Sequence, residues 1–148
     1  MIRVGLIGCG EHSESGHAVP LARYKAEHPD DLQLTSVCDL RRERAEYFCR
    51  QYGFLKSFAV LDEFLSTQQF DLCIAVVPVE RIASVGIKLS QRGIPCVIEK
   101  PLGSSLSEIT ALRDAFRSTG TPNRVSVNRR FMPFLKRAIE WTRSIGEL

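Results

Sequence analysis

Two glycines one residue apart stand at the end of the first apolar run, in the segment VGLIGCGEHSESGHAVPLA at residues 4–22. Gly8 would permit a tight turn there, and Gly10 would let backbone N–H groups approach a diphosphate closely. Asp39 closes the second apolar run, where its carboxylate could accept hydrogen bonds from ribose hydroxyls. These residue types and positions predict a dinucleotide site, with a bend that binds no ligand as the alternative.

The third glycine of the usual dinucleotide pattern is missing. Ser13 stands three residues after Gly10, and Gly16 follows three residues later. We therefore expect a lengthened loop and a different close approach of helix to strand. The interval from Gly8 to Asp39 also exceeds the usual spacing of about 20 residues, and an enlarged first loop with a turn at residues 28–31 would absorb the excess.

Lys100 ends another apolar run, in the sequence IEKPL at residues 98–102. An ammonium group at the carboxyl edge of a parallel sheet could hydrogen-bond a substrate hydroxyl and stabilise the alkoxide as hydride leaves the same carbon. Glu99 could orient Lys100 or the nicotinamide ribose, and Pro101 could follow a cis peptide bond. A lysine in a solvated loop is the alternative interpretation.

The hydrophobic pattern predicts the elements that position these residues. Runs rich in Val, Ile, Leu and Phe predict strands at residues 3–7, 33–38, 57–60, 72–77, 96–99 and 124–128. Helical patterns cover residues 18–27, 41–52, 62–67, 79–91, 107–118 and 133–144. Helix ends are followed by glycines expected in the left-handed conformation: Gly53, Gly93, Gly120 and Gly146. The alternation predicts an α/β fold, a doubly wound parallel Rossmann sheet of about six strands with helices on both faces.

Composition narrows the class of protein. A length of 148 residues with 44% hydrophobic residues predicts one domain with an ordinary core. Nothing at the N-terminus resembles a secretory signal and no apolar run reaches membrane-spanning length, so we expect a cytoplasmic protein with no membrane partner. The net charge of +3 is spread along the chain, which argues against nucleic acid and favours small anionic ligands.

The cysteines are widely separated, and no Cys/His pattern has metal-ligand spacing, so no metal site is predicted. We interpret the cysteines as small packed residues: Cys9, Cys38, Cys49, Cys73 and Cys96. Cys9 lies between the two glycines, but no activating histidine is reliably placed beside it, so we do not interpret it as a nucleophile.

The IEKPL segment resembles the signature of the glucose–fructose oxidoreductase, inositol dehydrogenase and MocA family of nicotinamide-dependent oxidoreductases. Other segments resemble the family in the same order: VGLIGCG at residues 4–10, VCD at 37–39, VVP at 76–78 and NRRFMP at 128–133. The resemblance spans essentially the whole chain. It is most specific in EKP, because the glycine turn and the arginine segment stand at matching separations from it.

This resemblance implies a dinucleotide-binding Rossmann domain over residues 1–148, with Lys100 as the catalytic residue. It places the cofactor contacts on Gly8, Cys9, Gly10, Glu11, His12, Asp39, Leu40, Arg41, Val77, Pro78 and Glu99. The implied reaction moves hydride between NAD, or NADP, and a hydroxyl-bearing carbon of a sugar, a cyclitol or a derivative. A non-catalytic dinucleotide-binding or sensor module stays open as the alternative.

Family members continue into a second α/β domain that supplies the substrate pocket, a catalytic histidine or aspartate and often an oligomer interface. We expect the chain to end before that domain, because residues 144–148 resemble the crossing into it. The full-length parent is expected to be a homo-oligomer. Family members also often carry Asn and His where Val79 and Ile82 stand, so the cofactor contacts there must differ.

Several charged residues leave alternatives open. Arg41 and Arg42 could bind an adenosine 2′-phosphate, but Asp39 would repel it, so NAD is expected ahead of NADP. His12 and His17 flank the glycine turn; we expect solvated histidines there rather than catalytic ones. A pair near the C-terminus, Arg129 and Arg130, could contact an anionic ligand or an acidic neighbour elsewhere in a longer chain.

Overall fold

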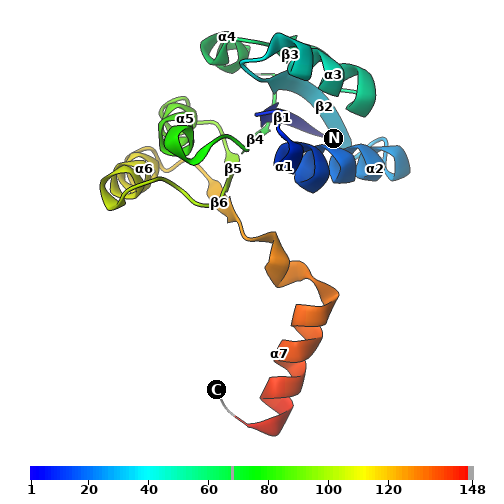
Figure 1. Ribbon diagram of the computed structural model, residues 1–148, viewed down its shortest axis with the longest axis vertical. Coiled ribbons are helices and arrows are strands. Elements are labelled where there is room, and N and C mark those ends of the chain that lie inside the picture. The colour runs from blue at the N-terminus through cyan, green and yellow to red at the C-terminus, as the bar shows by residue number, and fades with distance from the viewer. Residues whose placement is uncertain (68, 147–148) are drawn as a thin grey trace.

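Six parallel strands form one sheet in the computed structural model, which describes residues 1–67 and 69–146 (Figure 1). The strands are β1 (Ile2–Ile7), β2 (Leu32–Cys38), β3 (Lys56–Phe58), β4 (Leu72–Ala75), β5 (Cys96–Glu99) and β6 (Asn123–Ser126). Their order across the sheet is β3-β2-β1-β4-β5-β6. This order defines a doubly wound Rossmann sheet, so the predicted fold class is confirmed.

Helices connect the strands. They are α1 (Glu11–Ser13), α2 (Val19–Glu27), α3 (Arg42–Tyr52), α4 (Leu61–Ser66), α5 (Val79–Gln91), α6 (Leu106–Thr119) and α7 (Pro133–Ile145). A π-helical turn, η1 (Glu14–Ala18), joins α1 to α2, and a 3-10 helix, η2 (Asn128–Phe131), precedes α7.

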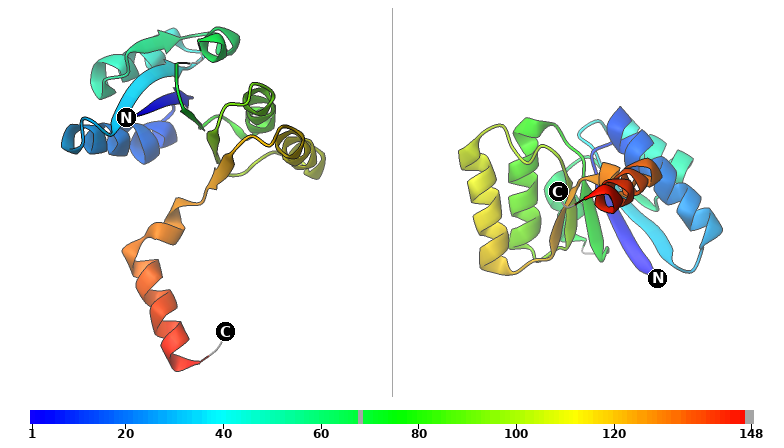
Figure 2. Two further views of the ribbon diagram at one scale, coloured as in Figure 1. Left: turned by 180° about the vertical axis from the view of Figure 1, so that it is seen from behind. Right: turned by 90° about the horizontal axis from the view of Figure 1, so that it is seen from below.

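Buried side chains pack on both faces of the sheet. On one face α2 and α3 cover a cluster that includes Leu6, Leu34 and Phe48. On the other, α4, α5 and α6 cover a cluster that includes Phe64 and Leu89. Figure 2 shows α5 and α6 on the side of the sheet opposite to α2. Both faces are therefore covered, as predicted.

The first helix begins earlier than predicted, at Glu11 rather than at residue 18. Gly10 is its N-cap, and the Gly10 carbonyl accepts a hydrogen bond from the Glu14 N–H at 2.9 Å. The lengthened loop expected after Gly10 is therefore wrong. The π-helical turn holds the additional residue inside the helix, and the many polar side chains of this segment obscured its period.

The strand ends and glycines differ in small ways from the prediction. β3 and β6, the edge strands, are displaced toward the N-terminus by one or two residues, because the sequence immediately after each remains apolar but leaves the sheet. Gly53, Gly93 and Gly120 have positive φ as expected, whereas Gly146 is extended at φ 159° and ψ 169°, so the prediction for it is wrong. The peptide bond before Pro101 is cis, as expected.

The C-terminal helix α7 extends away from the sheet (Figures 1 and 2). Large apolar side chains stay exposed on it, including Phe134, Trp141 and Ile145. The predicted crossing at residues 144–148 falls partly outside the described residues, which end at residue 146. Within those residues the structure contains no helix long and apolar enough to cross a membrane.

Candidate functional site

The turn after β1 requires glycine at position 8. Gly8 has a φ of +95°, and its N–H donates a hydrogen bond to the Cys38 carbonyl at 2.7 Å. A Cβ atom on Gly8 would lie 1.9 Å from the Val76 carbonyl oxygen. Since Cys38 ends β2 and Val76 follows β4, the turn lies where the ends of three adjacent strands meet.

Gly10 is partly buried but borders open space, unlike Gly8. It caps the first helix in an ordinary extended conformation, with φ −77° and ψ 174°, and nothing lies within 4 Å of a Cβ atom built on it. The bare backbone and the helix N-terminus together suit a phosphate group, because N–H groups and the helix dipole both favour negative charge there.

Ser13 takes the place of the third glycine. It is fully buried, and its hydroxyl donates a hydrogen bond to the Gly8 carbonyl at 2.6 Å. A small side chain therefore still lets the helix approach the strand, and the hydroxyl fixes the turn from inside. This contact explains how the chain tolerates the departure from the usual glycine pattern.

Asp39 is held beside the glycine turn by two backbone groups. Its Oδ2 accepts a hydrogen bond from the Cys9 N–H at 2.7 Å, and its Oδ1 accepts one from the Arg41 N–H at 2.9 Å. The Arg41 Nε lies 3.4 Å from the same Oδ1. A carboxylate offers about four lone-pair sites, so acceptors remain for ribose hydroxyls.

A cavity of about 950 Å³ lies at the carboxyl ends of the strands, where ligands of doubly wound sheets bind. Its lining brings together most of the predicted site residues: Gly8, Gly10, Glu11, His12, Asp39, Leu40, Arg41, Val77, Pro78, Glu99 and Lys100. Cys9 does not line it. The Cys9 side chain is buried behind the turn, and burial raises the pKa of its thiol, which fits a packed residue rather than a nucleophile.

Helix α5 forms a wall of this cavity that the sequence did not indicate. Its lining includes four polar residues from successive turns of this helix: Glu80, Arg81, Ser84 and Lys88. Ile82, where family members often carry His, is buried in the core instead. The departure at this position therefore leaves a packed side chain where a polar contact would be.

A second unpredicted group supports the glycine turn from behind. The Arg44 Nε donates to the Cys9 carbonyl at 3.0 Å, and its Nη2 donates to the Glu14 Oε2 at 2.8 Å. The Tyr52 hydroxyl donates to the other oxygen of Glu14. Hydrogen bonds from Tyr52 and Arg44 hold the pKa of Glu14 below its usual range. In the sequence Arg44 is one of several scattered charges, and only the fold reveals its partners.

Glu99 is buried at the end of β5, with 4% of its surface exposed. Its Oε2 accepts a hydrogen bond from the Lys100 N–H at 3.0 Å, and its Oε1 lies 3.1 Å from the His17 Nε2 and 3.3 Å from the His12 Nε2. Burial raises the pKa of Glu99, but hydrogen bonds from Ser126, His17, Lys100 and His12 outweigh it and hold the pKa below the usual value.

The expectation that His17 is solvated is therefore wrong, because its side chain is only 11% exposed and contacts Glu99. His12 does remain exposed, at 57% of its side chain. No local pattern predicts this contact, since 82 positions separate His17 from Glu99.

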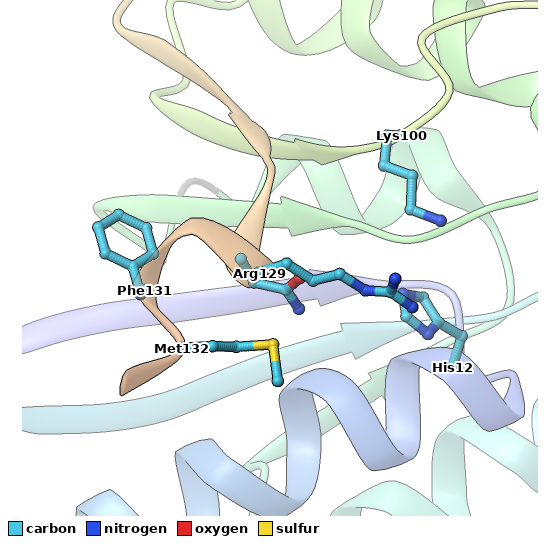
Figure 3. Close-up of a pocket in the computed structure, with 6 residues that line it drawn as sticks. His12, Lys100, Arg129, Phe131 and Met132 are labelled. Carbon is cyan, nitrogen blue, oxygen red and sulfur yellow. The ribbon is translucent and has the colours of Figure 1, made fainter. Parts of the chain in front are cut away.

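A smaller cavity of about 510 Å³ adjoins Lys100 (Figure 3). It is lined by His12, Lys100, Asn128, Arg129, Phe131 and Met132. Figure 3 shows the Lys100 side chain extending from one side, and Arg129 reaching toward His12 from the other. Arg129 thus faces a space that a ligand could enter, whereas Arg130 is not part of its lining.

The sheet order, the glycine turn and the acidic residue at the end of β2 define a dinucleotide-binding domain of the Rossmann class. Residues 2–128 match the oxidoreductase family with an NAD-binding Rossmann fold. The chain therefore belongs to the glucose–fructose oxidoreductase, inositol dehydrogenase and MocA family, and the matched region is its NAD-binding domain.

Individual proteins agree with this assignment. An uncharacterized protein of Saccharomyces cerevisiae is 26% identical over 147 residues, covering 98% of this chain and 41% of the relative. The structure of the WlbA dehydrogenase from Bordetella pertussis, in complex with NADH and UDP-GlcNAcA, is 26% identical with a TM-score of 0.81, covering 96% of this chain and 42% of that chain.

The fold is also that of scyllo-inositol dehydrogenase from Lactobacillus casei, solved with NAD(H) and scyllo-inositol. The TM-score is 0.86 at 16% identity, over 97% of this chain and 41% of that one. The chain thus spans about two fifths of the length of the proteins that it matches.

Proposed function

We propose that this chain is the cofactor domain of an oxidoreductase that transfers hydride between NAD and a hydroxyl-bearing carbon of a sugar, a cyclitol or a derivative. The observation that carries the proposal is the 950 Å³ cavity, which has the glycine turn and Asp39 along its wall together with Lys100. The same cavity can therefore hold a dinucleotide and expose its nicotinamide to a substrate beside a catalytic cation.

One end of the cavity would hold the adenosine half of the cofactor, and the other end would hold the reacting half. Gly8 and Gly10 let the backbone approach the diphosphate, and Asp39 and Leu40 contact the adenosine half. Val77 and Pro78, after β4, contact the middle of the cofactor, while Glu99 positions the backbone of Lys100 through the bond at 3.0 Å. The Lys100 ammonium then stabilises negative charge on the substrate oxygen as the C–H bond breaks.

The substrate would enter next to Lys100. The 510 Å³ cavity presents Lys100 and Arg129 as cations and Asn128 as a hydrogen-bonding side chain, with Phe131 and Met132 as apolar surface. Hydroxyl-rich and anionic molecules both suit such a lining. In support, one similar structure was solved with NAD(H) and scyllo-inositol, and another with NADH and UDP-GlcNAcA.

Family membership supports the oxidoreductase over a non-catalytic sensor module, because the family is one of oxidoreductases and the lysine of the EKP sequence is present. The rest of the substrate pocket and the oligomer interface would come from residues beyond this chain. We further propose a homo-oligomeric parent, in which the exposed aromatic side chains of α7 would be covered. A cytoplasmic location fits the five free cysteines.

Cofactor choice tests the role of Asp39. The wild-type chain should bind NADH more tightly than NADPH, because the Asp39 carboxylate repels a 2′-phosphate. Asp39→Ser should narrow or invert this difference, since Arg41 would lose its partner at 3.4 Å and could meet the phosphate. Calorimetric titration of both cofactors measures the two affinities.

Asp39→Asn is the matched control, because it removes the charge but keeps an acceptor for the Cys9 N–H. It should also narrow the difference while preserving the fold by circular dichroism. A wild-type preference for NADPH would contradict the assignment of Asp39, and so would an unchanged preference in both folded variants.

A further inference from the structure

A compact group is formed by His12, His17 and Glu99. The proposed hydride transfer uses Glu99 to position Lys100 but gives the two histidines no role. One ligating atom from each residue lies within 4.8 Å of the other two. The two shortest separations, 3.1 and 3.3 Å, join the histidine Nε2 atoms to the same oxygen, Glu99 Oε1. Two imidazoles and a carboxylate therefore converge on one point at the end of β5.

The π-helical turn creates this convergence. His12 and His17 are five residues apart, and in an α-helix such positions point roughly 140° away from each other. The turn over Glu14–Ala18 contains a bond from the Val19 N–H to the Glu14 carbonyl, five residues back, which brings positions five apart onto one face. The two rings consequently lie 6.1 Å apart, nearly perpendicular.

The ring of His12, the exposed member of the group, packs over Gly16. A Cβ atom on Gly16 would lie 3.6 Å from the His12 Cε1, at ordinary contact distance. The His12 side chain is 57% exposed, whereas that of His17 is 11% exposed. One side of the group is thus anchored in the protein, and the other faces the two cavities that His12 lines.

The two histidine–carboxylate separations match a metal site. Two ligands bound tetrahedrally to zinc at about 2.0–2.1 Å lie about 3.3 Å apart, close to both histidine–carboxylate separations. Two histidines and one glutamate make up a ligand set that zinc uses with a fourth position left open. The Lys100 N–H donates a hydrogen bond to Glu99 Oε2 at 3.0 Å, which fixes the carboxylate as supporting groups do in metal sites.

Charge gives a further reason. Glu99 is buried, and in the described part of the chain its ion-pair partners are the two imidazoles alone. A divalent cation would satisfy the carboxylate and both nitrogens together. Lys100 and Arg129 line the adjoining cavity, and their positive charges repel a bound cation. They therefore favour an anionic group or hydroxide as the fourth ligand of the metal.

We propose that His12, His17 and Glu99 bind one divalent transition metal ion, with zinc as the ion that the ligand set favours. The site lies at the edge of the dinucleotide cavity and does not depend on the proposed reaction. It can therefore be tested on this chain without any cofactor or substrate.

Calorimetric titration with Zn²⁺ and visible absorption with Co²⁺ test the site, on protein without a histidine tag. The wild type should bind one ion, with the absorption bands of tetrahedral Co²⁺ bound to nitrogen and oxygen. His12→Gln and His17→Gln should each weaken Zn²⁺ binding by about tenfold or more, because each removes a direct ligand.

His28→Gln is the matched control, because this third histidine lies against the Tyr24 ring, 4.5 Å between centroids, outside the group. It should bind Zn²⁺ like the wild type. If His17→Gln fails to fold, the exposed His12 decides the test alone. The proposal is overturned if the folded wild type binds no Zn²⁺, if a folded His12→Gln binds it as tightly, or if His28→Gln weakens binding equally.

Discussion

Replacing Lys100 with alanine should lower turnover by about 10²- to 10⁴-fold in the protein that completes this chain to the length of its relatives. The ammonium is proposed to stabilise the alkoxide that develops as hydride leaves, and alanine offers neither charge nor a proton. The affinity for NADH should change by only a few-fold, because the glycine turn and Asp39 hold the other half of the cofactor. Steady-state kinetics and NADH titration separate the two effects.

Lys56→Ala is the matched control for that experiment. Lys56 is an exposed lysine on the edge strand β3, where it donates to Gln69 rather than lining either cavity. It should leave turnover unchanged. Normal turnover in a folded Lys100→Ala variant would remove Lys100 from the chemistry. The 148-residue chain alone should turn over no polyol, because part of the substrate pocket is proposed to lie beyond it.

Gly8→Ala should destabilise the domain by about 3 kcal/mol or more and abolish NADH binding. The substitution combines a φ of +95°, costing about 1–3 kcal/mol for a residue with a Cβ, with a Cβ placed 1.9 Å from the Val76 carbonyl. Either the turn or the end of β4 must move, and both form the cofactor site. Chemical denaturation and NADH titration measure the two losses.

Gly120→Ala separates the cost of a positive φ from the cost of the steric clash between a Cβ on residue 8 and the Val76 carbonyl. Gly120 also has positive φ, at +67°, but nothing lies within 4 Å of a Cβ built there. Gly120→Ala should lower the free energy of unfolding by only about 1 kcal/mol, because alanine disfavours the positive φ. NADH binding should stay intact. Equal destabilisation by the two substitutions would show that the close approach of Gly8 to Val76 does not constrain the turn.

Much of the fold could be predicted, because most residues of the strands β1, β2, β4 and β5 are buried and their sequences are largely apolar. Their carboxyl ends must share one edge of a parallel sheet. Gly8, Asp39 and Lys100 follow such runs, so their meeting around one cavity was predictable from order alone.

What could not be predicted depends on contacts across the chain. The start of the first helix was missed because its first turns are mostly polar, and their fully buried residues are Ser13 and Ala18. Arg44 hydrogen-bonds the Cys9 carbonyl from 35 positions away in the sequence, and 82 positions separate His17 from Glu99. No local pattern distinguishes such side chains from solvated ones, since their partners are determined by helix placement on the sheet.

The dinucleotide site is tested most directly by a titration of the wild-type chain with NADH, monitored by the amide chemical shifts of a ¹⁵N-labelled sample. We expect saturable binding of one NADH, with the largest shifts at Gly10, Glu11, Asp39 and Val77. Gly10→Leu should keep the fold, because a Cβ on Gly10 meets nothing within 4 Å, yet lose about tenfold or more in affinity by blocking the diphosphate. Absence of binding by the folded wild type, shifts confined to other surfaces, or undiminished binding by Gly10→Leu would contradict a dinucleotide site at this turn.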